Sequence, residues 1–420
     1  MSMNKIAVIG GGISGVSVAN LLHEKTEVKV FDKNDRPGGL VRCERVEDNL
    51  YHKVGGHVFN SKNQEVLDWF WKHFDREKEF NKTQRNAKIL FEGRYIGYPI
   101  ENYLYQMPEA YIDKIIDDLM AITRDGTKDP MEYGNFKDFL QANFGKTLYD
   151  SYFGPYNNKI WKTDLSNVSL EWLQGKLPMP NIKEVLKSNI LQQEETGMVH
   201  AFFYYPKENG SQFVIDRLAE GLDVVNDQFI TSIKHVDNRW EVNGETFDQI
   251  VYCGDIRKLY DMVQVEDKPT IEALKAVTQL KSNGTSNLFC ETDDNDISWL
   301  YLPNPELKAH RIIYTGNFAE SNNRGSGRKT CTVEFSGRYT EEEMKAELKH
   351  LPGHLTPLAS NYEANSYVIQ EQDTGERVDN VKNKLVPLGF QLLGRFAEWE
   401  YYNMDKAIEA AMEVKNKLVK

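Results

Sequence analysis

Several features are scarce or absent in this sequence, and each absence excludes a class of protein. Only four cysteines occur, far apart and without a CxxC pair, so neither a metal site nor a disulfide framework is indicated. No apolar run approaches the roughly 20 residues that span a bilayer, and the start of the chain lacks the pattern of a signal peptide. The formal net charge of -12 disfavours a nucleic-acid partner. We therefore expect a reduced, cytoplasmic protein without a membrane span or a bound metal.

What remains is the composition of an ordinary globular protein. Of the 420 residues, 40% are hydrophobic and 27% are charged. This length exceeds that of one small domain, so we expect two or three domains with a large core.

The amino-terminal segment carries a dinucleotide-binding pattern. An apolar strand over 6–9 runs into Gly10, Gly12 and Gly15 in the spacing GxGxxG, and the next residues predict a helix over 13–25. In such a turn the first glycine permits a tight bend, the second lets the backbone approach a pyrophosphate, and the third lets the helix pack against the strand. The positive end of the helix then faces the phosphates.

The residues after this turn indicate which dinucleotide is bound. A second strand, predicted over 27–31, ends in Asp32, at the distance expected for a carboxylate that accepts hydrogen bonds from a ribose. Gly38 and Gly39 follow in the segment 36–40, which resembles the second phosphate-contacting turn of FAD-binding oxidoreductases rather than NAD dehydrogenases. We therefore predict FAD as the cofactor.

Two further segments are candidates for ligand contacts. Gly55 and Gly56 precede His57, which indicates backbone pressed close to a flat group such as the isoalloxazine ring; a turn with a solvated histidine is the alternative. The segment 153–162 is dense in aromatic residues, interleaved with Asn and Lys. It predicts either core packing or a partly open aromatic surface that stacks a base or a sugar.

The coarse pattern predicts an α/β protein with a discontinuous Rossmann-like FAD-binding domain, a helical insertion and an antiparallel-sheet substrate domain. A hairpin is expected around Glu92-Gly93, helical periodicity begins near Pro108, and a last helix starts near Met404. The expected order is a first FAD-binding segment over 1–85, a substrate-sheet hairpin over 86–107, the helical insertion over 108–192, a second FAD-binding segment over 193–260, the antiparallel sheet over 261–375 and a third FAD-binding segment over 376–420.

Taken together in this order, the motifs resemble the UDP-galactopyranose mutase family. The resemblance covers nearly the whole chain, although the flavin motifs near both ends are shared with amine oxidases and protoporphyrinogen oxidases. The segments that carry it, besides the amino-terminal motif, are 55–59, 155–161, 299–301 with Arg311, and 394–401.

The resemblance implies a non-redox use of a redox cofactor. In these mutases, N5 of reduced FAD attacks the anomeric carbon of a nucleotide sugar and expels the nucleoside diphosphate. The sugar ring opens and recloses through another hydroxyl, which interconverts pyranose and furanose for cell-surface polysaccharide precursors. The implied partners are a nucleotide sugar and a cellular reductant, NAD(P)H or a reduced electron carrier, and a homo-oligomer is left open.

Site residues follow from the motifs and from the resemblance. The predicted catalytic residues are His57, Arg311, Tyr301, Tyr367 and Tyr401, and the predicted substrate-binding residues are Tyr156, Asn157, Trp161 and Asn403. Predicted cofactor contacts are Gly10, Gly12, Ile13, Ser14, Gly15, Asp32, Lys33, Gly38, Gly39, Leu40, Gly56, His57, Phe229, Gly394, Arg395 and Met404.

The sequence also departs from the family pattern. The family places a diphosphate-binding arginine on the strand before the turn at 207–211, but the segment 201–206 contains none. Asn403 stands where bacterial mutases carry an acidic residue, and Val368 replaces a proline. A different nucleotide sugar, an amine-oxidase-type flavoenzyme acting on a small or sugar-linked substrate, and a non-catalytic flavoprotein therefore remain alternatives.

Overall fold

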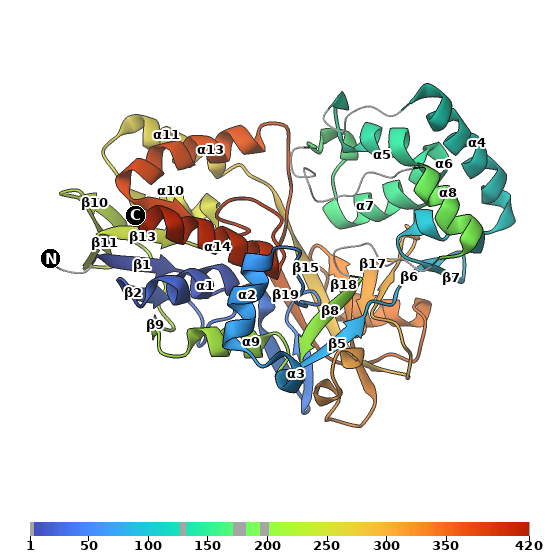
Figure 1. Cartoon of the computed structure of the whole chain (residues 1–420), viewed down its shortest axis with the longest axis horizontal. Helices are drawn as coiled ribbons and strands as arrows, with labels where there is room; N and C mark the ends of the chain where they lie inside the picture. The colour runs from blue at the N-terminus through green and yellow to red at the C-terminus, as the bar shows by residue number, and fades with distance from the viewer. Residues whose placement is uncertain (1–3, 127–131, 171–181, 194–200, 420) are drawn as a thin grey trace.

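The computed structural model describes residues 4–126, 132–170, 182–193 and 201–419. Figure 1 shows a parallel sheet with its helices on one side of the molecule, and a larger sheet with a helical region on the other. Two stretches of the predicted helical insertion, 127–131 and 171–181, and the start of the second predicted FAD-binding segment, 194–200, lie outside the described residues.

The amino-terminal motif belongs to a five-stranded sheet built from widely separated segments of the chain. The strand order is β20, β13, β1, β2, β9, and every neighbouring pair is parallel. Parallel neighbours need long crossover connections, so the chain leaves this sheet and returns to it. The predicted discontinuous Rossmann-like α/β domain is confirmed. Its strands are β1 (Lys5–Ile9), β2 (Glu27–Phe31), β9 (Asp223–Val225), β13 (Gln249–Tyr252) and β20 (Phe390–Leu392).

Helices cover both faces of this sheet. The first helix, α1 (Ile13–Leu22), ends three residues before the predicted end, and it packs against the last helix, α14 (Met404–Leu418). Ala410 and Ala411 lie in this contact. The remaining helices of this region are α2 (Gln64–His73), α3 (Arg76–Glu79), α9 (Gln212–Ala219), α10 (Leu259–Met262), α11 (Lys268–Val277) and α13 (Thr374–Leu385).

A small four-stranded sheet, in the order β12, β11, β10, β14, adjoins the parallel sheet. Its strand β10 begins only at Ile233, because Asp227 N and Gln228 N donate to carbonyls of the loop after β2 instead of to a strand. The segment 247–253 is divided between this sheet and the parallel sheet. The strands are β10 (Ile233–Val236), β11 (Arg239–Val242), β12 (Glu245–Phe247) and β14 (Val263–Gln264).

The larger sheet has seven strands in the order β19, β15, β18, β17, β16, β6, β7. All its pairs are antiparallel except β16 with β6, so the expected antiparallel sheet is mixed at one point. The predicted hairpin forms β6 and β7. The longest strand, β19, was not predicted. The strands are β6 (Ala87–Phe91), β7 (Arg94–Gly97), β15 (Ser282–Thr292), β16 (Trp299–Tyr301), β17 (Ala309–Ile313), β18 (Lys329–Ser336) and β19 (Thr356–Val368), with α12 (Glu341–Glu347) beside them.

Two short ribbons join these regions: β3 (Cys43–Val46) with β4 (Asn49–His52), and β5 (Phe80–Gln84) with β8 (Phe202–Pro206). The helical region stands above the large sheet (Figure 1). Within it, a π-helical turn over Tyr149–Phe153 interrupts the regular repeat, and such turns often accompany functional sites. The helices are α4 (Glu109–Asp125), α5 (Phe136–Phe144), α6 (Lys146–Leu148), α7 (Gly154–Trp161) and α8 (Ile182–Leu191).

Candidate active site

Two glycine turns come together at the carboxyl end of the parallel sheet. Gly12 and Gly38 form a parallel bridge, and a Cβ added to Gly39 would lie 3.0 Å from Gly12 Cα. A Cβ at Gly15 would lie 1.9 Å from Gly10 O, so only glycine allows α1 to approach β1 this closely. The structure thus places the two predicted phosphate-contacting turns side by side, where exposed backbone can approach a diphosphate.

Asp32 is buried, and its carboxylate is mostly used by the protein itself. Oδ2 accepts a hydrogen bond from Gly11 N at 2.7 Å, and Oδ1 accepts from the backbone N and side-chain Nδ2 of Asn34, both at 2.8 Å. A carboxylate has about four acceptor positions, so one remains for a ribose hydroxyl. Asp32 therefore also fixes the first glycine turn, a role that the sequence did not predict.

The carboxyl-terminal motif reaches the same place from the other end of the chain. A Cβ at Gly394 would lie 2.8 Å from Ser14 Oγ, so this segment touches the start of α1. The Arg395 guanidinium donates to Ser366 O at 3.1 Å and to Tyr402 O at 2.5 Å, and it lies over the Tyr401 ring at 4.5 Å. These contacts hold Arg395 in a fixed position beside the glycine turns.

His57 is joined to a second histidine, His52, that the sequence patterns did not reveal. His57 N donates to His52 Nδ1 at 3.4 Å, and His52 Nε2 lies 2.8 Å from the Tyr205 hydroxyl. Nδ1 is thus an acceptor, which assigns the proton of the neutral imidazole to Nε2. Burial lowers the pKa of His52 to about 4 and that of His57 to about 3, so both are neutral near pH 7. His57 Nε2 is enclosed and has no hydrogen-bond partner within the described ranges.

Arg311 is fixed by a buried carboxylate from the neighbouring strand, Glu334. The two form a close ion pair in which Arg311 Nε donates to Glu334 Oε2, and the Arg311 side chain is 17% exposed whereas that of Glu334 is fully buried. Burial alone would raise the pKa of Glu334, but Arg311 and His310 hold it well below its usual range. Glu334 Oε1 accepts from Gly55 N at 2.8 Å. One carboxylate therefore connects Arg311 to the glycine pair before His57.

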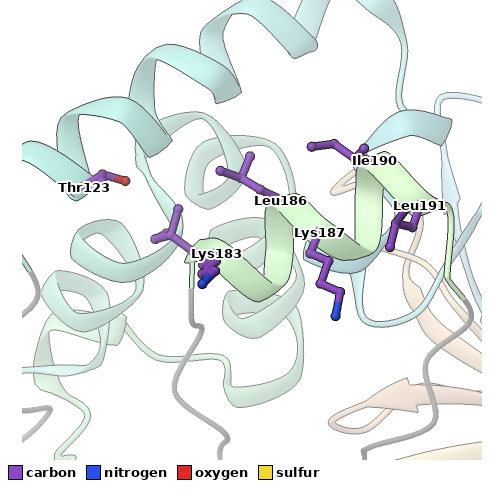
Figure 2. A pocket seen from close by; sticks show the side chains of 7 residues that line it. Thr123, Lys183, Leu186, Lys187, Ile190 and Leu191 are labelled. Carbon is purple, nitrogen blue, oxygen red and sulfur yellow. The ribbon is translucent and has the colours of Figure 1, made fainter.

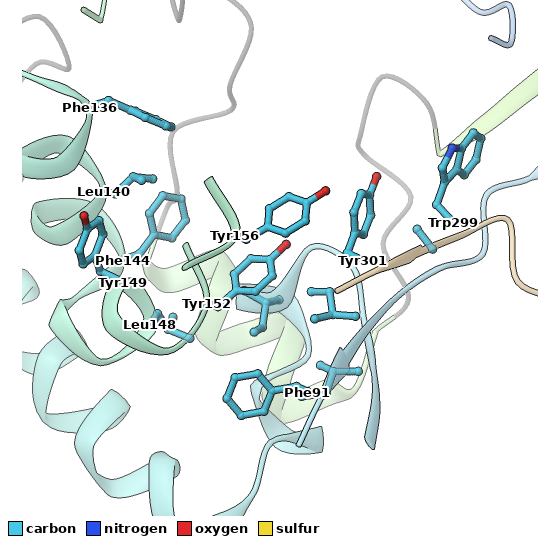
Figure 3. Packing of buried hydrophobic residues seen from close by; sticks show 14 of the residues in the cluster. Phe91, Phe136, Leu140, Phe144, Leu148, Tyr149, Tyr152, Tyr156, Trp299 and Tyr301 are labelled. Atoms are coloured by element: carbon cyan, nitrogen blue, oxygen red, sulfur yellow. The ribbon is translucent and has the colours of Figure 1, made fainter. Parts of the chain in front are cut away.

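Tyrosines from the helical region and the large sheet meet near Arg311, because Tyr301 pairs with Arg311 across β16 and β17. Figure 3 shows Tyr152, Tyr156 and Tyr301 with their hydroxyls directed toward the same side. The rings of Tyr152 and Tyr156 are stacked at 5.8 Å, and Tyr156 meets Tyr301 edge-on at 5.5 Å. Burial raises the pKa of Tyr156 well above its usual value, so its hydroxyl stays protonated and can donate.

The two remaining predicted tyrosines lie together, Tyr367 on β19 of the large sheet and Tyr401 in the segment before α14. The rings of Tyr367 and Tyr401 are stacked with their centroids 6.2 Å apart. Burial raises the pKa of Tyr367, and the charge of Arg311 opposes that shift, so Tyr367 is close to the same ion pair. Arg395 lies over Tyr401. The predicted catalytic residues are thus brought to one region.

Arg85 is a further cation of this cluster, and it was not among the predicted site residues. Its Nη2 donates to the Tyr301 hydroxyl at 2.6 Å, and its guanidinium lies over the rings of Tyr98 at 4.8 Å and Trp299 at 5.2 Å. It follows β5 directly, and no local pattern in the sequence marks it.

Not every predicted site residue lies in this cluster. Phe229 is 65% exposed, and Lys33 is also exposed. Asn157 Nδ2 donates to Phe153 O within its own helical turn, and Trp161 is buried in the core of the helical region. Asn403 is the N-cap residue of α14. The structure therefore gives Asn157 a local partner and leaves Phe229 on the surface, whereas Ile13 and Leu40 lie at the glycine turns.

Other site types find no support among the residues that the structure describes. No group of three or more His, Cys, Asp or Glu residues there could hold a metal ion. None of the described helices is long and apolar enough to cross a membrane. An apolar surface groove between α4 and α8 (Figure 2) involves none of the predicted site residues. It is lined by Thr123, Ile182, Lys183, Leu186, Lys187, Ile190 and Leu191.

Comparisons with known proteins agree with this fold. Residues 8–74 match a family model described as an NAD(P)-binding Rossmann-like domain. UDP-galactopyranose mutase of Mycoplasma genitalium is 22% identical over 428 residues, which covers 96% of this chain and 92% of that protein. The crystal structure of a reduced UDP-galactopyranose mutase superimposes with a TM-score of 0.89 at 20% identity, covering 100% of this chain and 94% of that one.

Two further relatives match over a shorter stretch. A probable UDP-galactopyranose mutase of Klebsiella pneumoniae is 26% identical over 182 residues, 43% of this chain and 46% of that protein. dTDP-fucopyranose mutase of Escherichia coli is 28% identical over 185 residues, 42% of this chain and 46% of that protein. These matches span less than half the length of either relative. Over nearly its full length the chain is therefore similar in sequence to a UDP-galactopyranose mutase, and it shares the fold of these enzymes.

Proposed function

We propose that this protein is a flavin-dependent mutase that interconverts the pyranose and furanose forms of a nucleotide sugar. The observation that carries the proposal is the convergence of three features: the glycine turns of the parallel sheet, the segment before His57, and a cluster of arginines and tyrosines. Glu334 ties the second feature to the third, because it binds both Gly55 N and Arg311.

The residues at the parallel sheet fit FAD. Gly12, Gly38 and Gly39 leave the backbone accessible to a diphosphate, and α1 begins directly beyond Gly12. The enclosed Nε2 of His57 needs a partner that the described protein groups do not supply, and a flavin ring against this segment would supply one. When bound and reduced, the flavin supplies an electron-rich nitrogen as a nucleophile toward an anomeric carbon.

The remaining chemistry is the departure and return of a nucleoside diphosphate. Arg311, held in place by Glu334, is a bidentate donor for phosphate oxygens, and Tyr156 and Tyr301 direct hydroxyls into the same region. Pre-positioned donors stabilise the charge that develops on a leaving group without having to reorganise. The aromatic walls exclude water, which protects a reactive sugar from hydrolysis.

His57 acts in this proposal as a neutral group. Burial lowers its pKa to about 3, so it places no positive charge beside the cofactor at working pH. It can donate or accept one hydrogen bond there, depending on its tautomer.

The test is an anaerobic incubation of the purified protein with UDP-galactofuranose, a dTDP-fucose furanose and their pyranose forms, with dithionite and without it. We expect at least one pyranose–furanose pair to interconvert, and only when the flavin is reduced. Chromatography measures the ratio of the two isomers. Oxygen consumption with a nucleotide sugar or an amine, without isomerisation, would overturn the proposal in favour of an oxidase. No turnover in either assay would indicate a non-catalytic flavoprotein.

A further inference from the structure

The strand that lacks an arginine in this sequence faces a different arginine. In the ribbon of β5 and β8, Gln84 pairs with Phe202, and the next residue, Arg85, donates its backbone N–H to Ala201 O at 2.9 Å. The segment 201–206 is the one in which the family pattern expects a diphosphate-binding arginine. Arg85 therefore lies directly across from that segment, immediately after the neighbouring strand β5.

The surroundings of Arg85 contain acceptors and aromatic rings but no counter-charge. Nη2 donates to the Tyr301 hydroxyl, and the rings of Tyr98 and Trp299 cover the guanidinium. Nε is fully enclosed without an acceptor, and no carboxylate within the described residues forms an ion pair with Arg85. An enclosed cation without an anion is unfavourable, so this site is incomplete without a negatively charged ligand.

Arg85 and Arg311 flank the same tyrosine. Tyr301 of β16 pairs directly with Arg311 of β17, which puts their side chains on one face of the sheet. The tyrosine hydroxyl accepts from Arg85. Arg311 is already neutralised by Glu334, so the net positive charge on this side comes from Arg85.

Building on the function proposed above, we propose that Arg85 binds the diphosphate of the nucleotide sugar and takes the place of the arginine absent from β8. The planar guanidinium, stacked between aromatic rings, presents its free N–H groups to the space beside Tyr301. Arg85 donates hydrogen bonds to the diphosphate from the side opposite to the Arg311–Glu334 pair, so the leaving group is bound between the two arginines.

The test compares binding of UDP and of uridine by the FAD-loaded protein, using titration calorimetry. In Arg85→Ala we expect UDP to bind about 10- to 100-fold more weakly, because charge-assisted hydrogen bonds are lost. The affinity for uridine, which has no phosphate, should change by less than about threefold. Arg85→Lys should recover some of the UDP affinity, and Arg94→Ala, an exposed arginine on β7, is the matched control with unchanged affinity.

UDP affinity in Arg85→Ala within about twofold of the parent protein would overturn the proposal, as would an equal loss for uridine. If Arg85→Ala fails to retain FAD, the same comparison of UDP affinity with uridine affinity is made in Arg85→Lys and Arg85→Gln. Absence of UDP, dTDP and pyrophosphate binding by the parent protein would also overturn it. Arg85-dependent UDP binding in a protein that isomerises no nucleotide sugar would contradict the proposed function and leave this inference standing.

Discussion

Glu334 is the side chain on which the position of Arg311 depends. Both of its oxygens accept from donors, Arg311 Nε on one side and Gly55 N on the other. Glu334→Gln replaces one oxygen by an NH2 group, which then faces a donor. We expect the free energy of unfolding to fall by about 3 kcal/mol and the KM for the nucleotide sugar to rise about tenfold or more, measured by urea denaturation and steady-state kinetics.

Glu291→Gln is the matched control for this variant. Glu291 is buried in β15 and accepts from Asn49 Nδ2 at 2.9 Å and Ser326 Oγ at 2.7 Å, apart from the predicted site residues. Its substitution should lower stability but leave KM unchanged. An equal rise of KM in both variants would mean that Glu334 acts only through general stability.

The buried His52 makes the free energy of unfolding depend on pH. Its pKa is lowered by burial to about 4, whereas an unfolded histidine titrates near 6.5. Between these values the unfolded chain binds a proton that the folded chain does not, so stability falls as pH decreases. We expect a loss of about 1.4 kcal/mol per pH unit from His52 alone between pH 6 and pH 4, measured by urea denaturation.

His52→Gln should be less stable at pH 7.5 but show a shallower dependence below pH 6. The exposed His354 provides the control, because His354→Gln should keep the slope of the parent protein. Parallel curves for the parent and His52→Gln would show that another group causes the acid sensitivity.

At the scale of elements, Lys159 attaches the helical region to the large sheet. Its ammonium group, on α7, donates to Leu302 O and Asn304 O, both at 2.6 Å, and to Ala309 O at 3.2 Å. Tyr156 lies one turn earlier on the same helix. Lys159→Met should therefore loosen α7 and raise KM several-fold, with faster hydrogen exchange in α7 measured by mass spectrometry.

The control for this prediction is Lys146→Met, because Lys146 is exposed on α6 and pairs with Asp150 in an i,i+4 contact. Such exposed pairs contribute a few tenths of a kcal/mol. Unchanged exchange rates in α7 of Lys159→Met would refute its anchoring role.

The elements that the sequence predicts are those set by local rules. The hairpin of β6 and β7 follows from Glu92-Gly93, which both adopt positive φ at the turn. By contrast, β19 shows no alternation, because most of its residues are half-buried on both faces and it pairs only with β15 at the sheet edge. Tyr367 could be identified only through the family resemblance, since its strand leaves no pattern.

The same distinction holds for the candidate site. The glycine turns are local and could be predicted, whereas Arg85 is defined by contacts with Ala201 and Tyr301, more than a hundred residues away. The sequence offered one usable signal for Glu334, which is the single charged residue of the segment 330–335. His52 gave none, because its role depends on Tyr205.

At the scale of the whole molecule, the predicted cofactor site draws on both ends of the chain. The turns at Gly12 and Gly39 and the segment at Gly394 meet around the start of α1, so a bound FAD would link segments of the protein that are distant in sequence. A ligand that binds only the folded state adds stability by mass action, about 2.7 kcal/mol at a hundredfold excess over Kd. Removing the flavin should therefore lower the melting temperature.

Gly12→Ala separates this ligand effect from folding itself. Gly12 has φ -75 and ψ -177, which any residue adopts, and an added Cβ would lie 3.7 Å from Gly39 Cα, an ordinary contact. The methyl group fits the protein but occupies space beside the phosphate-contacting backbone. We expect deflavinated Gly12→Ala to melt within about 1 °C of the deflavinated parent. Added FAD should raise its melting temperature much less than that of the parent. In Gly134→Ala, at an open surface position, added FAD should raise the melting temperature as much as in the parent. Equal gains in Gly12→Ala and the parent would show that the diphosphate of FAD does not approach this turn.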